Sequence, residues 1–304
     1  MKKLAILLIA ICLFLSAASC GRHAPTVSPS HTLTPTSSLT ATTPPYTPTP
    51  LPTQGELEIH FIDVGQGDSI LIDLGETEVL IDGGEKSPGV VDYLKKYVDG
   101  PLEVMVATHP HSDHIGGLIA VLAVFQVQQI WYNGENGGSA TYNEFVAAVQ
   151  AEGADIHVGK RGDNIVAGRL TFLILNPKTL AGTVNNNSIV LSLSYGQVDF
   201  LFMGDAEKEA EGAMLVASDI PVPDVEVLKV GHHGSRTASS PAFLAATSPE
   251  VAIYMAGTGN RYGHPHQETL AALAQIGAKV YGTDVNGAII VSTDGRTFVV
   301  QTER

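Results

Sequence analysis

The feature that most constrains this chain is the six-residue run 109–114, which reads His-Pro-His-Ser-Asp-His and follows a short apolar stretch. Three imidazoles and one carboxylate this close together indicate a metal site rather than a polar loop with accidental histidines. Alternate side chains of an extended segment point the same way, so His109 and His111 can share one ion. Asp113 and His114 lie past the bend and can face a second ion. Because zinc prefers nitrogen and oxygen donors of this kind, we expect two divalent ions, zinc first and manganese as the alternative.

Two further polar positions follow apolar, strand-like stretches. Asp205 ends the run Leu-Phe-Met-Gly-Asp, and a carboxylate can touch two ions at once, as two-metal sites about 3.5–4 Å apart require. His232 and His233 follow the apolar stretch 225–230. Only one of these adjacent histidines can easily reach the second ion. The other is a candidate for orienting a ligand or contacting the leaving group, and both assignments stay open.

A third histidine cluster, 262–266, reads Tyr-Gly-His-Pro-His and lies on a Gly/Pro-rich turn. His264 can enter the site as a substrate contact or proton donor, or remain on a surface turn. Asp82 is expected to orient a ligand histidine. Asp68 is expected to cap the turn between the first two strands.

Three other residues are candidate substrate contacts. Arg236 and Arg261 are the cations next to the clusters, and Arg suits an anionic phosphate, although solvated surface positions are the alternative. Asn187, in the Asn-rich run before Ser188, completes the substrate-binding set.

The N-terminus is typical of an exported protein. Residues 1–20 have a basic start, a short apolar run and small residues before Cys20, which predicts a signal peptide rather than a membrane span. Cys20 resembles the lipidated residue of bacterial lipoproteins, although Ala17 stands where Leu is usual. The only other cysteine, Cys12, lies inside the segment that would be removed. We expect a lipid anchor on Cys20 at the outer face of the cytoplasmic membrane or the cell surface, with ordinary secretion as the alternative.

Residues 21–55 are rich in Thr, Pro and Ser and predict a disordered tether. Residues 56–304 form one expected domain. Since Lys2, Lys3 and Arg22 lie before it, this domain carries 14 of the 17 Lys and Arg against all 31 Asp and Glu, a formal net charge of −17. Such acidity excludes a broad nucleic-acid-binding surface, but not attack on a single phosphodiester. The sequence predicts no stable protein partner.

Within the domain, short apolar strands alternate with amphipathic helices. Expected strands are 57–63, 69–73, 78–82, 103–108, 129–132, 169–175, 188–195, 199–203, 225–230, 251–255, 279–282, 288–292 and 297–301, the first three forming an antiparallel meander. Expected helices are 88–98, 115–124, 142–152, 207–217, 241–246 and 267–276. This order predicts an α/β fold in which two sheets pack face to face between helix layers.

Together these motifs resemble the metallo-β-lactamase fold superfamily, and more narrowly the hydrolase domain of ComEC-type DNA-uptake competence proteins. The matching runs are Phe-Ile-Asp-Val-Gly-Gln-Gly-Asp-Ser-Ile-Leu-Ile from 61, His-Pro-His-Ser-Asp-His-Ile-Gly-Gly from 109, Asn-Asn-Ser-Ile-Val-Leu from 186, Phe-Met-Gly-Asp-Ala from 202, Lys-Val-Gly-His-His-Gly-Ser from 229 and Gly-His-Pro-His from 263. The resemblance covers about 57–301 and lacks the membrane channel portion of a competence protein.

The resemblance implies an αβ/βα four-layer sandwich with a metal-dependent hydrolytic site on one edge. It implies that one ion is held by His109, His111 and Asp205, and the other by Asp113, His114, Asp205 and one of His232 and His233. Many superfamily members place another His where this chain reads Asn-Asn-Asn-Ser at 185–188. The first ion is therefore expected to be one imidazole short and open to water.

The expected activity is hydrolysis by a water whose pKa two metal ions lower towards about 7. The first candidate substrate is a phosphodiester, cleaved in the manner of a nuclease or phosphodiesterase, with His264 or the non-ligand member of the His232–His233 pair protonating the leaving oxygen. The alternative is a carbonyl ester such as a lactone or β-lactam. A tethered binding module with a structural metal site is the alternative from another class.

Overall fold

The computed structural model describes residues 55–304. The expected signal peptide, the lipidation of Cys20 and nearly all of the tether lie outside the described residues and stay predictions. Among residues 55–304, no helix combines the length and the apolarity that crossing a bilayer requires.

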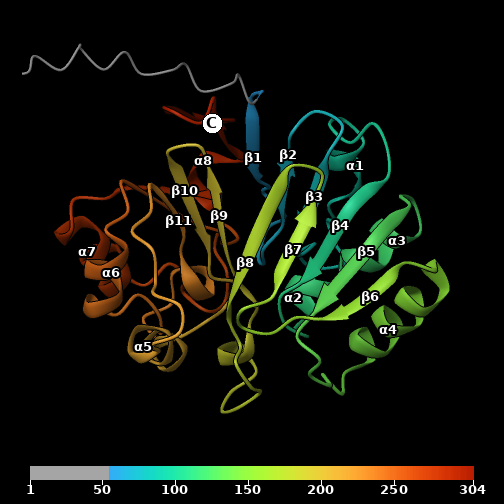
Figure 1. Cartoon of the computed structure of the whole chain (residues 1–304), viewed down its shortest axis with the longest axis horizontal. Helices are drawn as coiled ribbons and strands as arrows, with labels where there is room; N and C mark the ends of the chain where they lie inside the picture. The colour runs from blue at the N-terminus through green and yellow to red at the C-terminus, as the bar shows by residue number, and fades with distance from the viewer. Residues whose placement is uncertain (1–54) are drawn as a thin grey trace, which may run out of the picture. The chain divides into compact units, whose positions relative to one another are not determined.

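Two β-sheets form the centre of the described part (Figure 1). The first has the strand order β15 (Phe298–Thr302), β14 (Ile289–Thr293), β1 (Leu57–Phe61), β2 (Ile70–Asp73), β3 (Glu78–Ile81), β4 (Leu102–Ala107), β5 (Val127–Tyr132), β6 (Asp155–Val158). The second has the order β13 (Lys279–Gly282), β12 (Val251–Tyr254), β11 (Val227–Lys229), β10 (Val198–Phe202), β9 (Val190–Tyr195), β8 (Leu170–Asn176), β7 (Asn164–Ala167). The expected antiparallel meander β1–β2–β3 is confirmed.

Helices cover the outer faces of both sheets. The described residues form the helices α1 (Val91–Leu94), α2 (Ser112–Ile115), α3 (Leu118–Leu122), α4 (Ala140–Glu152), α5 (Lys208–Val216), α6 (Pro241–Thr247), α7 (Gln267–Gln275) and α8 (Thr283–Asn286), with 3₁₀ turns η1 (Asn185–Asn187) and η2 (Gly231–Gly234). Figure 1 shows α3 and α4 on the side of the first sheet, and α5, α6 and α7 on the side of the second.

Alternating side chains of the strands explain the layers. Inward residues such as Ile59 and Phe61 of β1 and Phe200 of β10 form one apolar cluster between the sheets. The opposite faces pack against helices, with Leu118 in the first helix layer and Phe243 in the second. Each fully buried side chain of this size contributes about 1.5–3 kcal/mol. The expected α/β sandwich with two inner sheets and two outer helix layers is confirmed.

The prediction of a single helix at 115–124 is wrong. The structure has two short helices, α2 and α3, separated at Gly116 and Gly117. A Cβ on Gly117 would lie 2.0 Å from the carbonyl oxygen of Gly83, so only glycine lets this turn approach the loop after β3. Because α2 starts at Ser112, Asp113 and His114 lie on a helical turn.

The strands β6 and β7 and the short helix α8 were not expected from the sequence. β6 begins with an acidic residue and leaves Ile156 and Val158 exposed, so it has no buried face with a period of two. It forms by pairing with β5 at the edge of the first sheet.

Candidate metal centre

The site lies where loops after three strands meet. His109 and His111 follow β4, Asp205 follows β10, and His232 and His233 lie on η2 after β11. Figure 1 shows α2, which carries Asp113 and His114, directly after the end of β4. The backbone hydrogen bond from Gly83 to the His114 carbonyl, 2.7 Å, fixes this turn against the first sheet.

Three buried atoms converge without partners. The Nε2 atoms of His114 and His233 lie 3.3 and 3.4 Å from Oδ1 of Asp205, and none of the three has a hydrogen-bond partner within residues 55–304. Asp113 adds Oδ2 at 3.3 Å from His233 Nε2. An unsatisfied buried polar atom costs about 1–3 kcal/mol, so three together need a common partner. Two imidazoles and two carboxylates are a donor set that fits zinc or manganese.

The second ring nitrogen, Nδ1, of both His114 and His233 contacts a protein oxygen atom. His114 Nδ1 lies 2.7 Å from Oδ2 of Asp82, and Asp82 also accepts hydrogen bonds from the backbone and hydroxyl of Thr108. His233 Nδ1 lies 2.9 Å from the Met255 carbonyl oxygen. A ligand histidine held in this way presents Nε2 in a fixed direction. The expected contact of Asp82 with a histidine of the cluster is confirmed.

Asp68 was expected from the sequence to cap a turn, but its side chain contacts both His233 and Lys229. It is buried behind His233, with Oδ1 3.1 Å from His233 Nδ1 and Oδ2 2.6 Å from Nζ of Lys229. Its carboxylate lies within 4.8 Å of ligand atoms of His114, Asp205 and His233. Both of its oxygens already have partners, however, so the geometry favours Asp113 over Asp68 as a ligand, and Asp68 contacts His233 at Nδ1. The signal in the sequence was Lys229 itself, since a lysine in an apolar strand must be paired.

The packing of these side chains shifts the pKa values of the histidines in the site. Burial alone would lower the pKa of His114, but the carboxylates of Asp205 and Asp82 raise it well above the usual value. Asp205 and Asp68 raise the pKa of His233 against the same effect of burial. Burial lowers the pKa of His109. A pKa raised by converging carboxylates marks a place of strong negative potential, where a cation is stabilised.

A second group of donors faces the other oxygen of Asp205. His109 Nε2 and His111 Nδ1 lie 3.0 Å apart, and His109 Nε2 lies 3.7 Å from Oδ2 of Asp205. His109 Nδ1 is held by the hydroxyls of Thr108 and Ser188, at 3.1 and 3.3 Å. The two oxygens of Asp205 thus face two separate donor groups, which is the arrangement that a bridging carboxylate needs.

The structure places His232 and His233 differently. His233 is buried in the Asp113–His114–Asp205 group, whereas the side chain of His232 is 22% exposed. His232 Nδ1 lies 3.0 Å from Oε1 of Glu207, and its Nε2 lies 3.8 Å from Oδ2 of Asp205. Positive φ angles of 48° and 54° at these adjacent residues turn both rings towards the site. The geometry therefore favours His233 as the ligand.

A pocket of about 260 Å³ opens beside these groups. Its lining residues are Gln66, His111, Ser112, Asp113, Asn185, Asp205, His232, His233, Tyr262 and His264. The ring of His264 lies 5.2 Å from that of His232, centre to centre. Burial and the neighbouring imidazoles lower the pKa of His264 to about 4, so this side chain is neutral at pH 7.

The three expected substrate contacts lie farther from the donor groups. Asn187 is buried, and its side-chain amide bonds to Glu135 and to the backbone of Ala181. Asn185 of the same turn lines the pocket instead. Arg236 is exposed and lies 3.7 Å from a carboxylate oxygen of Glu268. Arg261 is exposed, with its guanidinium over the ring of Tyr262, which lines the pocket.

Comparisons with known proteins match this architecture. The family described as "Metallo-beta-lactamase superfamily" matches residues 62–258. The chain is 32% identical over 257 residues to "ComE operon protein 3" of Bacillus subtilis and 30% identical over 245 residues to "Recombination protein 2" of Haemophilus influenzae. Each match covers 77% of this chain but only 33% and 29% of those relatives, so the chain spans about a third of their length.

Solved structures show the same fold at low sequence identity. The metallo-beta-lactamase fold protein YhfI from Bacillus subtilis superposes with a TM-score of 0.51 and 13% identity, covering 76% of this chain and 98% of that one. A metal-dependent hydrolase of the beta-lactamase superfamily gives 0.51 and 14%, covering 81% and 100%. The resemblance drawn from the sequence motifs, including the competence proteins, is confirmed.

Proposed function

The chain belongs to the metallo-beta-lactamase superfamily, and on this basis we propose that it is a metal-dependent hydrolase that cleaves a phosphodiester bond. One observation carries the proposal: buried, partnerless Nε2 atoms of His114 and His233 converge on Oδ1 of Asp205, while Oδ2 faces a second donor group. A structural site would enclose its ion, whereas this one opens into a pocket.

In this proposal each ion has its own set of ligands, and Asp205 belongs to both sets. His109, His111 and Asp205 hold the first, which keeps a position open because the run 185–188 reads Asn-Asn-Asn-Ser where the resemblance leads us to expect another imidazole. Asp113, His114, Asp205 and His233 hold the second. When bound, two such ions supply Lewis acidity and a lowered pKa for water. Zinc suits the donors best, and manganese is the alternative.

The remaining pocket residues position the substrate and move a proton. When protonated, His232 donates from Nδ1 to Glu207 and can donate from Nε2 to the leaving oxygen. His264, the alternative donor, borders the same space, but its lowered pKa leaves it neutral at pH 7 and so favours His232 in this role. Arg261 at the rim can pair with a phosphate oxygen. We place a phosphodiester before a carbonyl ester because the sequence motifs resemble those of DNA-uptake competence proteins.

The test is a substrate panel on the purified protein loaded with zinc or manganese. We expect turnover of bis(p-nitrophenyl) phosphate, and a loss of at least about 100-fold in kcat/KM in Asp205→Asn, because both donor groups use this carboxylate. His111→Ala, which removes a donor of the first group, should also lower kcat/KM, and His157→Ala, a histidine on β6 that does not line the pocket, is its matched control. Turnover of a lactone or a β-lactam with no phosphodiester cleavage would refute the substrate assignment. A bound ion with no hydrolysis of any ester would favour a binding module.

We also propose that the protein is exported and anchored by a lipid on Cys20. The signal-like N-terminus and the absence of any other cysteine in the mature chain support this. The expected result is recovery of the wild type in the membrane fraction and of Cys20→Ser in the soluble or secreted fraction. Equal fractionation of the two proteins would contradict the anchor.

A further inference from the structure

Tyr262 is the large aromatic side chain at the mouth of the pocket. It lines the same 260 Å³ space as Asp113, Asp205 and His233, yet 49% of its surface is exposed. Burial of a tyrosine ring is favourable, so a half-exposed ring beside a reactive site is available for a ligand.

The backbone around Tyr262 is fixed. Oδ1 of Asn260 accepts hydrogen bonds from the backbone N–H groups of Tyr262 and His264, at 3.1 and 3.0 Å. The Asn260 amide donates to the Gly257 carbonyl oxygen at 3.0 Å. The ring itself lies nearly parallel to that of His264, with centres 5.7 Å apart and planes 21° apart. A ring held in this way loses little conformational entropy when it binds a ligand.

A flat group already lies over the ring of Tyr262. The guanidinium of Arg261 is 4.9 Å from the ring centre, and its Nη2 donates to the tyrosine hydroxyl at 2.7 Å. The Arg261 side chain is long and exposed, so a substrate can displace it. Its position shows that the ring face accepts a planar group, and its charge disfavours a second cation there.

We propose that Tyr262 is a specificity-determining residue that stacks on one unpaired nucleobase next to the scissile phosphate. The inference rests on the proposed phosphodiesterase function and narrows its substrate to nucleotide diesters. Tyr262 lines the same pocket as Asp113, Asp205 and His233, so a group bonded to a phosphate held by those residues can reach its ring. Stacking is also the source of affinity that a domain of charge −17 can use, since phosphate attraction is weak there.

Two diesters with the same leaving group test this inference. They are thymidine 5′-(p-nitrophenyl phosphate) and methyl p-nitrophenyl phosphate, assayed with the full-length, metal-loaded protein. We expect a KM about tenfold lower for the nucleoside diester in the wild type, from the stacking of one base. Tyr262→Leu should raise that KM about tenfold with kcat little changed, and should leave the methyl diester unaffected. Tyr262→Phe, which keeps the ring, should behave as the wild type.

Tyr281→Leu is the matched control, because Tyr281 also has a cation, Lys279, over its ring but does not line the pocket. An equal loss on both diesters in Tyr262→Leu would show that the residue only supports His264 and would overturn the inference. No effect on either diester would overturn it as well.

A measurement of binding affinity, without catalysis, distinguishes failure of this inference from failure of the proposed function. Calorimetry should show thymidine 5′-monophosphate binding about tenfold more tightly than methyl phosphate to the wild type, and equally to Tyr262→Leu. If the wild type cleaves neither diester but retains this difference in affinity, the phosphodiesterase function fails and the stacking subsite stands. Equal affinities in the wild type refute the subsite.

Discussion

At the scale of single residues, the Lys229–Asp68 pair is the clearest case of a buried charge serving the site. Both side chains are buried, 2.6 Å separates Nζ from Oδ2, and the second oxygen of Asp68 faces His233. Removing one partner of a buried ion pair leaves an uncompensated charge, whereas replacing both can be nearly neutral.

We therefore expect Lys229→Met to lower the free energy of unfolding by about 3–5 kcal/mol in urea titrations. The double variant Lys229→Met/Asp68→Asn should recover most of this loss. Because an amide oxygen is a poorer acceptor for His233 than a carboxylate, the double variant should still bind metal about 10- to 100-fold more weakly in a chelator competition. Wild-type metal affinity in the double variant would contradict the orienting role of Asp68.

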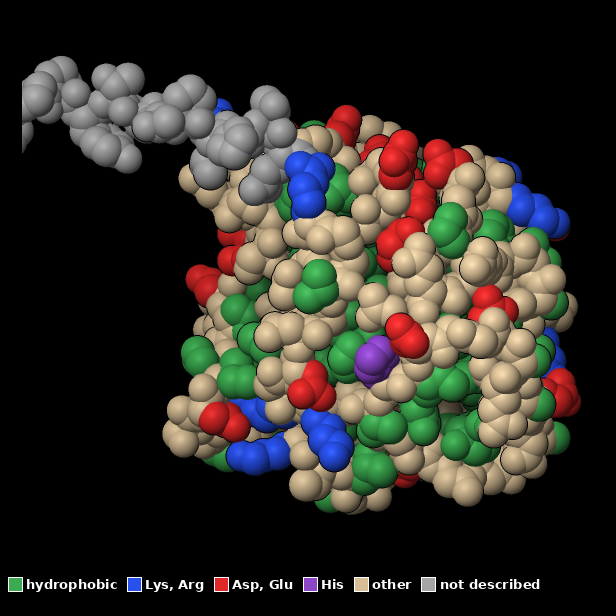
Figure 2. Space-filling model, turned by 45° about the vertical axis from the view of Figure 1, so that its right-hand side comes forward, with side chains coloured by type: hydrophobic (Ala, Val, Ile, Leu, Met, Phe, Trp, Pro, Cys, Tyr) green, Lys and Arg blue, Asp and Glu red, His purple; other side chains and the backbone are tan. Residues whose placement is uncertain are grey.

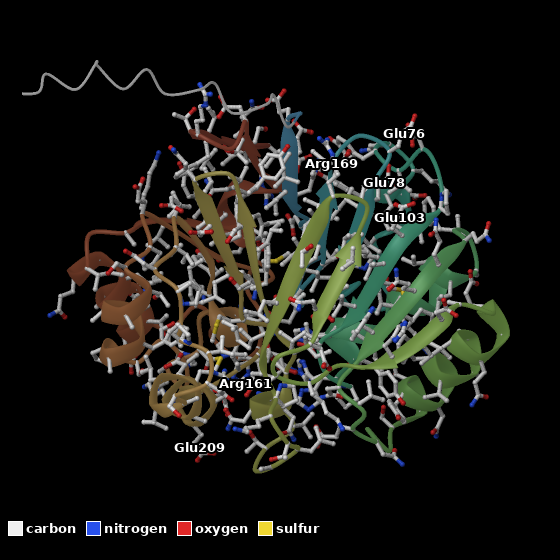
Figure 3. All side chains as sticks on the ribbon, viewed as in Figure 1. Glu76, Glu78, Glu103, Arg161, Arg169 and Glu209 are labelled. Carbon is white, nitrogen blue, oxygen red and sulfur yellow. The ribbon has the colours of Figure 1, made fainter. Side chains whose placement is uncertain are left out.

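Glu78 is a second residue whose behaviour follows from its surroundings. It is buried on β3, and Figure 3 shows it close to Glu103 of β4. Burial and the charge of Glu103 raise the pKa of Glu78 to about 8. The folded state therefore holds this proton more tightly than the unfolded chain, in which the pKa is ordinary.

This raised pKa gives a pH dependence of known sign. The stabilisation by the proton on Glu78 is complete below the ordinary glutamate pKa and is lost as pH rises through about 8. Glu78→Gln should flatten the fall of the melting temperature between pH 5 and 9. The exposed neighbour Glu76→Gln is the control and should follow the wild type. An unchanged slope in Glu78→Gln would argue against the buried proton.

At the scale of elements, the site depends on how closely the α2–α3 turn approaches the loop after β3. Apolar periodicity alone predicts one helix at 115–124, because Leu118, Val121 and Leu122 are buried on one face. The break at Gly116–Gly117 arises from a backbone contact with Gly83, which is distant in sequence. The local sequence pattern could not reveal this contact between distant segments. The same loop also fixes the position of His114, because the Gly83 N–H donates to the His114 carbonyl oxygen.

Gly117→Ala should therefore be severely destabilising. The added Cβ would lie 2.0 Å from the Gly83 carbonyl oxygen, so the turn must move and displace His114. We expect a melting temperature lower by several degrees and a loss of bound metal measured by elemental analysis. Gly212→Ala in α5 is the matched control, because nothing lies within 4 Å of its added Cβ. It should stabilise the protein by up to about 1 kcal/mol.

At the scale of the whole molecule, acidity limits how a nucleic acid can bind. On the face shown in Figure 2 acidic side chains are scattered, and Lys and Arg lie mainly towards its edges, several of them at the lower left. Of the cations beside the histidine clusters, Arg236 is close to Glu268 and Arg261 lies over the ring of Tyr262, which lines the pocket. A bound strand can therefore have only about one or two phosphates neutralised.

Binding of a short single-stranded oligonucleotide should consequently depend little on salt. Each neutralised phosphate on a single strand contributes a slope of about −0.7 to log K against log salt, so a slope between about −0.7 and −1.4 is expected. Fluorescence anisotropy between 50 and 300 mM salt measures it on a metal-loaded, catalytically inactive variant. A slope steeper than about −3 would reveal an extended basic surface and contradict this account.

The sequence by itself determined the chemistry of the centre and the layered fold. Short-range spacing brings His109, His111, Asp113 and His114 together, and the alternation of apolar residues requires buried sheet faces. Both follow from neighbours along the chain. Only the tertiary structure decided that His233 rather than His232 faces Asp113, that Asp68 and Lys229 stand behind it, and that Tyr262 borders the pocket. These contacts join segments far apart in sequence, and their geometry depends on backbone turns and packing that no local pattern specifies.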